Sequence, residues 1–383
     1  MIVIPLVFVA ISTAIINQKA EDLKKSAITI LSVLLITTAI AAVVGAGTAK
    51  AFKLDSSELH IGEQESIRGD VLDDTLDTFK EKSIPEQITE IIPRNIFFAM
   101  TGESSSSTLS VVFFAAFLGI AIIGLRRKKP ETAEAVTKFL NNLNTLVMRM
   151  VTLVLRLTPF GILALMTRFV ATSDFIEIAR LLKFVLASYV AILIMFLVHL
   201  IVISINGLNP VQYLRKSFGT LSFAFSSRSS AGAIPINVET QVNEFGVPKG
   251  IANLSASLGS SIGQNGCAGI YPAMLAVMIA TGLGIPLNAA FFIKLILITT
   301  ISSLGIAGVG GGATFAALTV LSSMGLPVGL VGLLIAIEPL IDMGRTALNV
   351  SGSMIAGIVT GKRSGEMDME KYNKKEMSLE ESN

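Results

Sequence analysis

Long apolar segments separated by short polar connections run through most of this chain. A window of about 19 residues, the length of a helix that spans a bilayer, finds them near 2–17, 26–53, 96–125, 143–170, 181–206, 213–236, 250–280, 289–327 and 330–361. Backbone in lipid must satisfy its own hydrogen bonds, which favours helices. Hydrophobic residues make up 52% of the sequence, and charged residues 15%. The sequence therefore predicts an all-α polytopic membrane protein.

Charged residues are distributed unevenly among the connections. Basic residues follow the first segment at Lys19, Lys24 and Lys25 and the third at 126–129, which predicts cytoplasmic connections there. The loop 54–95 is polar and acidic, which favours the outer side. The charged tail 362–383 follows the last apolar segment, and we expect it to be cytoplasmic and disordered.

Few residues have the spacing of a catalytic, metal or nucleic-acid site. The net charge is +2, and no stretch resembles a basic nucleic-acid surface. Cys267 has no companions at metal-ligand spacing, and we expect it to pack as a small residue. His199 stands alone in an apolar segment, where a histidine is usually a hydrogen-bonded interior group. Neither Ser229 nor Asp342 has a histidine near it in sequence. We therefore expect no enzyme, cofactor, metal site or nucleic-acid partner.

The last apolar segment carries a stripe of polar residues. Its members are Glu338, Asp342, Arg345, Thr346, Asn349 and Ser353. They recur at helical offsets, so one face of a helix holds all of them. Ionisable side chains at bilayer depth cost at least a few kcal/mol each and usually mark a transport pathway. The alternative is an Asp-Arg pair that only holds helices together.

Two other apolar segments are interrupted by residues that break helices. The segment 213–236 contains a run of serines around Arg228, followed by Gly232 and Pro235. The segment 289–327 contains several glycines between 305 and 312. Unwound backbone at membrane depth must be buried in protein or line a cavity, and in transporters such broken helices form the binding site. The alternative is a pair of kinked helices that span the membrane and pack through small residues.

These motifs resemble the dicarboxylate/amino acid:cation symporters, the glutamate transporter homologues. The stretch 226–235 resembles the first re-entrant hairpin of that family, and 307–312 resembles the tip of the second. The stretch 342–350 resembles the last helix of the family most closely. The likeness covers nearly the whole chain, and 337–353 is most similar to bacterial L-cystine uptake symporters. The resemblance implies secondary active uptake of an amino acid, best L-cystine, through elevator-type alternating access.

The resemblance also implies an organisation. Residues 1–206 would be N-terminal membrane helices, forming a scaffold and part of the transport unit. The transport core would be 207–361, with hairpin 1 at 213–236, a helix at 250–280, hairpin 2 at 289–327 and the last helix at 330–361. Family members have a complete first helix and a longer second one before the stretch that resembles this chain's beginning, so we expect the chain to start part-way through the second. A homotrimer in the inner membrane of a bacterial cell is implied.

The resemblance assigns substrate-binding roles to matching residues. Asp342 would receive the substrate ammonium, and Arg345 would hold a remote carboxylate in a bidentate geometry. Thr346 and Asn349 would hold the amino-acid head group. Arg228 would balance the charge of Asp342.

The two hairpin tips would complete the site. Ser229 and Ser230, on the first hairpin, would meet the α-carboxylate. Gly308 and Gly310, on the second, would allow the close backbone approach that covers the substrate.

Arg345 fits aspartate, glutamate or a C4-dicarboxylate as well as cystine, so symport of these acids, coupled to sodium or protons, is the alternative function. Glu338 would neutralise the second ammonium of cystine or hold Arg345. An ion channel is a weaker alternative, because charged and amide groups opposed by two hairpins suit saturable binding better than ion flow.

The coupling ion is expected to be a proton. Sodium-coupled members have an Asn-Met-Asp-Gly-Thr motif and a late aspartate, and this chain has Asn265 and Ser353 where those acids stand. Loss of both carboxylates weakens the usual sodium sites. Glu338 is the expected proton carrier. Sodium held by backbone carbonyls and Asn349 is the alternative.

Overall fold

The computed structural model describes residues 3–16, 20–56, 92–101, 107–155, 160, 175–305, 312–328, 331–334 and 337–374. Within these residues the chain is helical and contains no strand. The prediction of an all-α protein is therefore confirmed.

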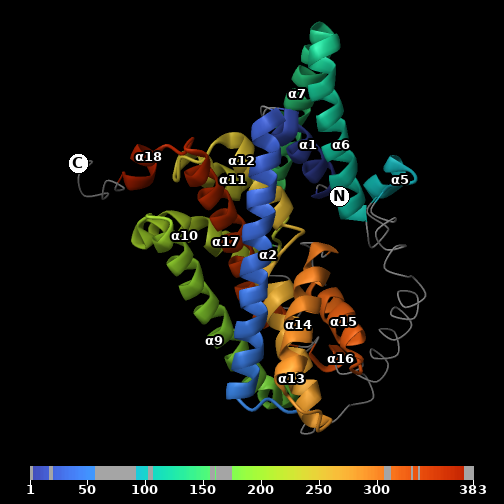
Figure 1. The fold of residues 1–383 in the computed structure, drawn as a ribbon, viewed down its shortest axis with the longest axis vertical. Helices are drawn as coiled ribbons and strands as arrows, with labels where there is room; N and C mark the ends of the chain where they lie inside the picture. Colours follow the sequence, from blue (N-terminus) through green and yellow to red (C-terminus); the bar gives the residue numbers. More distant parts are fainter. Residues whose placement is uncertain are drawn as a thin grey trace.

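The N-terminal half contributes long helices. They are α1 (Val3–Ile16), α2 (Ala20–Ala51), α5 (Ile96–Thr101), α6 (Ser107–Lys128), α7 (Pro130–Leu155) and α9 (Phe175–Ile205). In Figure 1, α2 runs along most of the molecule, while α6 and α7 project together beyond the other helices at one end.

The C-terminal half is made of shorter helices and one long one. They are α10 (Pro210–Ser227), α11 (Ile234–Asn243), α12 (Lys249–Gly259), the π-helix η1 (Asn265–Ile270), α13 (Tyr271–Gly282), α14 (Ala289–Ser302), the short 3-10 turn η2 (Ser303–Gly305), α15 (Gly312–Met324), α16 (Val331–Leu334), α17 (Glu338–Ser364) and α18 (Met369–Asn373).

Three helical segments in the described part of the chain are long and apolar enough to cross a membrane. They are Lys25–Ala51, Leu182–Ile205 and Asn265–Gly282. In the most apolar 18 residues of each, 33% of the first segment and 39% of the second are buried inside the protein, against 89% of the third. The third segment therefore lies in the protein interior, while α2 and α9 also present apolar surface outward.

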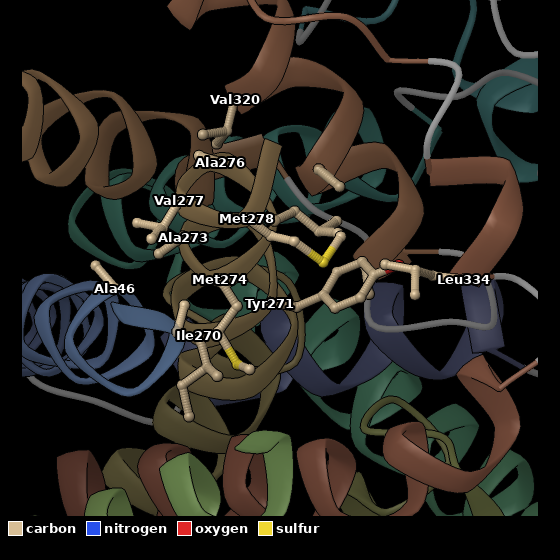
Figure 2. Packing of buried hydrophobic residues seen from close by; sticks show 14 of the residues in the cluster. Ala46, Ile270, Tyr271, Ala273, Met274, Ala276, Val277, Met278, Val320 and Leu334 are labelled. Carbon is tan, nitrogen blue, oxygen red and sulfur yellow. The ribbon is translucent and has the colours of Figure 1, made fainter. Parts of the chain in front are cut away.

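The buried apolar residues form two large cores. One core joins α13, α14 and α15 to parts of α2 and α9. Figure 2 shows its centre, where the residues of α13 lie between Ala46 of α2 and Leu334 of α16. The other core joins α10, α11 and α12 to the C-terminal half of α17. Because α2, α9 and α17 contribute to both cores, they hold the two ends of the molecule together.

The helix expected at 250–280 is broken in the structure. It ends at Gly259 and resumes as the π-helix η1 at Asn265. Gly263 has a φ of +64°, a conformation that favours glycine, and its N–H donates to the carbonyl of Ser303 at 3.1 Å. This break was not predicted, although π-helices are frequent at functional sites.

Several helix boundaries also differ from the expected segments. The helix expected to begin at 143 begins at Pro130, since proline at the first position and Glu131 in the first turn favour a helix start there. The last segment is divided, because α16 ends at Leu334 and α17 begins only at Glu338. The expected segment 96–125 includes α5 and most of α6, and residues 102–106 between them lie outside the described residues.

The beginning of the charged tail is ordered, contrary to expectation. Helix α17 continues to Ser364, and the following residues fold back as α18. Tyr372 is fully buried and packs on Phe245, with ring centroids 5.7 Å apart. Aromatic burial of this kind outweighs the charge of the surrounding tail. Residues 375–383 lie outside the described chain.

Candidate functional site

The serine-rich interruption forms a turn between two helices. Helix α10 ends at Ser227, Arg228 adopts the left-handed conformation at φ 52° and ψ 32°, and α11 begins at Ile234. The hydroxyl of Ser229 accepts a hydrogen bond from the N–H of Gly232 at 3.0 Å. The two helices therefore form a hairpin whose turn spans 228–233. Its insertion into a membrane stays a prediction.

A second contact fixes the two arms of this hairpin. The hydroxyls of Thr220 on α10 and Thr240 on α11 lie 2.7 Å apart, and both side chains are buried. A buried polar pair of this kind is satisfied only when the arms keep their register.

Four charged side chains form a continuous chain of ion pairs beside this turn. Arg228 Nε lies 3.1 Å from Asp342 Oδ2, and Asp342 Oδ1 lies 3.3 Å from Arg345 Nη2. Arg345 Nη2 also lies 3.4 Å from Glu338 Oε1. The cluster joins the hairpin turn to the first turns of α17, and its charges balance. Buried charges are expected to be paired in this way.

Arg345 is the most buried member of the cluster and is incompletely satisfied. Its side chain is 1% exposed. The guanidinium carbon lies 4.4 Å from the centre of the Tyr271 ring, a cation–π geometry. All its ion-pair contacts use Nη2, and Nε and Nη1 have no hydrogen-bond partner among the described residues. Buried donors without partners are costly, so Arg345 is prepared to bind a further acceptor.

Glu338 connects this cluster to the helix that follows the glycine-rich segment. Its Oε2 accepts a hydrogen bond from Thr314 Oγ1 at 3.4 Å. Thr314 lies in the first turn of α15, directly after the segment 306–311. Gly308 and Gly310 belong to that segment and lie outside the described residues. Glu338 therefore links α15 to Arg345.

The amide of Asn349 is used to hold the π-helix η1. Its Oδ1 accepts from the N–H groups of Gly266 at 2.8 Å and Cys267 at 3.4 Å. Its Nδ2 donates to Gln264 Oε1 at 3.3 Å and lies 3.1 Å from Cys267 Sγ. Asn349 thus supports the irregular backbone next to the ion-pair cluster. Thr346, one turn earlier on α17, is also buried.

Cys267 and Tyr271 lie at the cluster, although the sequence analysis did not assign them to the site. Cys267 Sγ lies 3.9 Å from Asp342 Oδ1, and Tyr271 stacks under Arg345. The proximity of Cys267 to Asn265 in the resembled motif was the available sequence signal.

Asn265 and Ser353 lie outside the ion-pair cluster and are held by neutral groups. Ser353 Oγ accepts from Asn237 Nδ2 at 2.7 Å. Asn265 contacts Thr37, Thr38 and His199. The described residues contain no group of three or more His, Cys, Asp or Glu side chains that would hold a metal ion.

The predicted site residues are therefore distributed as follows. The structure brings Arg228, Glu338, Asp342 and Arg345 into direct contact, and Asn349 lies beside them on α17. Ser229 and Ser230 follow Arg228 in the hairpin turn, where Ser230 is buried. Their roles in binding stay predictions.

Comparison with known proteins identifies the family. The model of the sodium:dicarboxylate symporter family matches residues 1–363. The chain belongs to the sodium:dicarboxylate symporter family. It is therefore a membrane transport protein, and the predicted family resemblance is confirmed.

Similar proteins in this symporter family come from bacteria. The L-cystine uptake protein TcyP of Bacillus cereus is 53% identical over 97% of this chain and 81% of its own length. The protein of the same name from Bacillus licheniformis is also 53% identical, with the same coverage of both chains. The one from Shouchella clausii is 52% identical over 97% of this chain and 80% of its own length.

Proposed function

We propose that this chain is a secondary active symporter that takes up L-cystine across the bacterial cell membrane. The observation that carries the proposal is the buried guanidinium of Arg345, which is paired with Asp342 and Glu338 and has two nitrogens without a partner among the described residues. The names and the 53% identity of the bacterial relatives support cystine as the substrate.

The charges of the cluster match those of cystine, which has an ammonium and a carboxylate at each end. Nη1 and Nη2, which share the outer edge of the Arg345 guanidinium, would donate to one carboxylate, because a guanidinium binds a carboxylate through two parallel hydrogen bonds. Asp342 would receive one ammonium and Glu338 the other. Substrate would then replace some of the present ion pairs, so little net charge would be left unbalanced in the interior.

Uptake of aspartate, glutamate or a C4-dicarboxylate is the second candidate function. The family description, which includes dicarboxylates, supports it, and Arg345 would bind their distal carboxylate equally well. The carboxylate of Glu338 beside Arg345 favours cystine, because it would repel a second substrate carboxylate that has no accompanying ammonium.

Proton coupling, a homotrimer and elevator-type alternating access are further parts of the proposal. Neutral Asn265 and Ser353, where sodium-coupled members carry acids, support protons over sodium. The homotrimer and the elevator movement rest on the family alone. Cross-linking in native membranes, followed by mass measurement, tests the trimer.

Uptake of labelled L-cystine into proteoliposomes tests the function. A pH gradient and a sodium gradient are imposed separately, with excess unlabelled cystine or aspartate as competitor and protein-free liposomes as control. We expect saturable uptake that is driven by the pH gradient and is blocked by cystine. Uptake that requires sodium and is blocked by aspartate would move the chain to the second candidate function.

A further inference from the structure

A buried chain of hydrogen bonds crosses the protein next to the substrate site. It runs from Thr37 and Thr38 on α2 through Asn265 of η1 to His199 on α9, and then to Ser351 on α17 and Tyr213 on α10. All six side chains are buried, and His199 and Tyr213 are fully inaccessible. The hydrogen bonds connect five elements, α2, η1, α9, α17 and α10.

The hydroxyls on α2 determine how the amide of Asn265 is oriented. Thr37 and Thr38 both donate to the carbonyl of Leu34, at 3.0 and 2.8 Å, so their oxygens are left to accept. Asn265 must therefore direct its NH₂ group to them, at 3.0 and 3.2 Å. Its Oδ1 then faces His199 Nε2 at 2.9 Å.

The orientation of Asn265 in turn defines the neutral form of His199. Because Asn265 Oδ1 accepts, Nε2 of the ring must carry a hydrogen. In the neutral ring, Nδ1 is an acceptor and receives the hydroxyl of Ser351, at 2.9 Å. Ser351 Oγ then accepts from the Tyr213 hydroxyl at 2.6 Å.

The same chain also satisfies a protonated ring. A proton added to Nδ1 would be donated to Ser351 Oγ. The Ser351 hydroxyl would rotate to donate to the oxygen of Tyr213, and the Tyr213 hydroxyl would turn to the Ser351 carbonyl, which lies 3.4 Å away. Only the new N–H bond forms, and the hydroxyls merely rotate. With the ring neutral or protonated, every donor in this hydrogen-bond network therefore has an acceptor.

Among the described residues, the groups in contact with the ring carry no charge. The groups that face it are Asn265 from η1 and Ser351 from α17, and Phe196 of its own helix packs on its edge. Among the six side chains of this hydrogen-bond network, Tyr213 is the only titratable group besides His199. A structural imidazole needs just one arrangement of these hydroxyls, whereas a proton-binding imidazole needs both.

The ring is connected to the substrate site through two short routes. Asn265 immediately precedes Gly266, whose N–H donates to Asn349 Oδ1. Ser351 follows Asn349 by half a turn of α17. A change of hydrogen bonding at His199 would therefore affect α17, which carries Asn349, and η1, which Asn349 contacts.

We infer that His199 binds the proton that is coupled to substrate uptake, at Nδ1, with Asn265 and Ser351 as its hydrogen-bond partners. This inference rests on the proposed function. It assigns the role of proton carrier to His199 in place of Glu338. Glu338 is thereby left to bind substrate. Linkage requires that substrate and proton raise the affinity for each other by the same factor.

Two transport assays on His199→Gln test the inference. Glutamine keeps an amide donor for Asn265 but does not titrate. We expect the variant to retain cystine exchange between two equal pools and to lose accumulation driven by a pH gradient. His60→Gln, in the polar loop 54–95, is the matched control and should accumulate cystine as the parent protein does. Gradient-driven accumulation by His199→Gln at the parent level would overturn the inference while leaving cystine symport intact.

A spectroscopic readout covers the case in which the variant fails to fold or the parent does not transport cystine. The chain has two histidines, so His60→Gln leaves His199 as the single imidazole. Nitrogen-15 NMR of this protein with labelled histidine reports the protonation of the ring directly. We expect Nδ1 to gain a proton as the pH is lowered from about 8 to about 4, because burial makes an imidazole harder to charge. A ring that stays neutral throughout this range, with and without cystine, contradicts the inference whatever the substrate.

Discussion

At the scale of single residues, the site depends on charges that partly satisfy one another. Arg345 contacts both Asp342 and Glu338 through one nitrogen, and its other two nitrogens have no partner in the described part of the chain. A charge buried without a partner is costly, so the same residues would stabilise the empty protein and bind the substrate.

Replacement of Arg345 by lysine should weaken cystine binding strongly. An ammonium keeps the charge but loses the planar pair of donors. Hydrogen bonds to charged groups contribute about 1.5–3 kcal/mol, which corresponds to a loss of about 10- to 100-fold in affinity. Equilibrium binding of labelled cystine to purified protein measures this change in affinity. Arg215→Lys, at an exposed position of α10, is the control, and equal losses in both variants would argue against a role for Arg345 in binding.

Replacement of Glu338 by glutamine should change substrate preference. We expect cystine uptake to fall more than uptake of a simple dicarboxylate, because only cystine carries a second ammonium. Competition uptake in proteoliposomes measures the ratio. Glu366→Gln, at an exposed position beyond α17, should leave the ratio unchanged. If Glu338→Gln lowers the uptake of cystine and of the dicarboxylate equally, Glu338 only supports Arg345.

At the scale of elements, the site is built from interrupted helices held close to α17. The hairpin turn brings Arg228 to Asp342, and η1 brings Cys267 to the same carboxylate. Tyr271, the first residue of α13, lies against Arg345. The backbones of η1 and α17 approach closely at Gly266, where an added Cβ would lie 2.7 Å from the Cα of Arg345. Such an approach is open only to glycine.

Substitution of Gly266 by alanine should therefore destabilise the protein. Overpacking of an interior costs about 1–3 kcal/mol, and the displaced η1 would also lose its bonds to Asn349. The thermal midpoint of the detergent-solubilised protein should fall, and cystine binding should weaken. Gly219→Ala is the matched control, since nothing lies within 4 Å of its added Cβ and alanine favours the helix α10. A variant of Gly266 as stable as this control would show that η1 shifts freely.

At the scale of the whole molecule, the end of the chain closes the second core. Lys216 Nζ, on α10, donates to the carbonyls of Glu244 and Tyr372 at 3.0 Å each. The Tyr372 hydroxyl donates to the carbonyl of Asn209 at 2.9 Å. Burial raises the pKa of Tyr372, so this donor stays protonated. The segment after α17 thus holds the outer end of the hairpin formed by α10 and α11.

Loss of the Tyr372 ring should loosen this end of the protein. Truncation of a fully buried aromatic residue to alanine costs about 3–5 kcal/mol. Tyr372→Phe keeps the ring and should cost only about 1 kcal/mol, for one hydrogen bond. Thermal unfolding measures the loss of stability in each variant, and limited proteolysis of the tail reports whether this end of the protein has loosened. An unchanged midpoint for Tyr372→Ala would mean that the tail does not support the hairpin.

Local patterns in the sequence were enough to predict the helical membrane fold, the polar stripe of α17 and the interruption at Arg228. Each depends on a short-range rule, either helical periodicity or the weak helix propensity of glycine, serine and proline. The break before η1 was missed, because it is stabilised by Asn349 and Ser303, which lie far away in sequence.

Tertiary structure alone decided the surroundings of His199 and Tyr372. In the sequence, His199 is an isolated polar residue and Tyr372 belongs to a charged tail. The hydrogen-bond partners of His199 come from η1 and α17. Those of Tyr372 are Asn209, which caps α10, and Lys216 within α10. Hydrogen bonds and packing between distant segments depend on how the helices are placed, and periodicity within one segment does not record that placement.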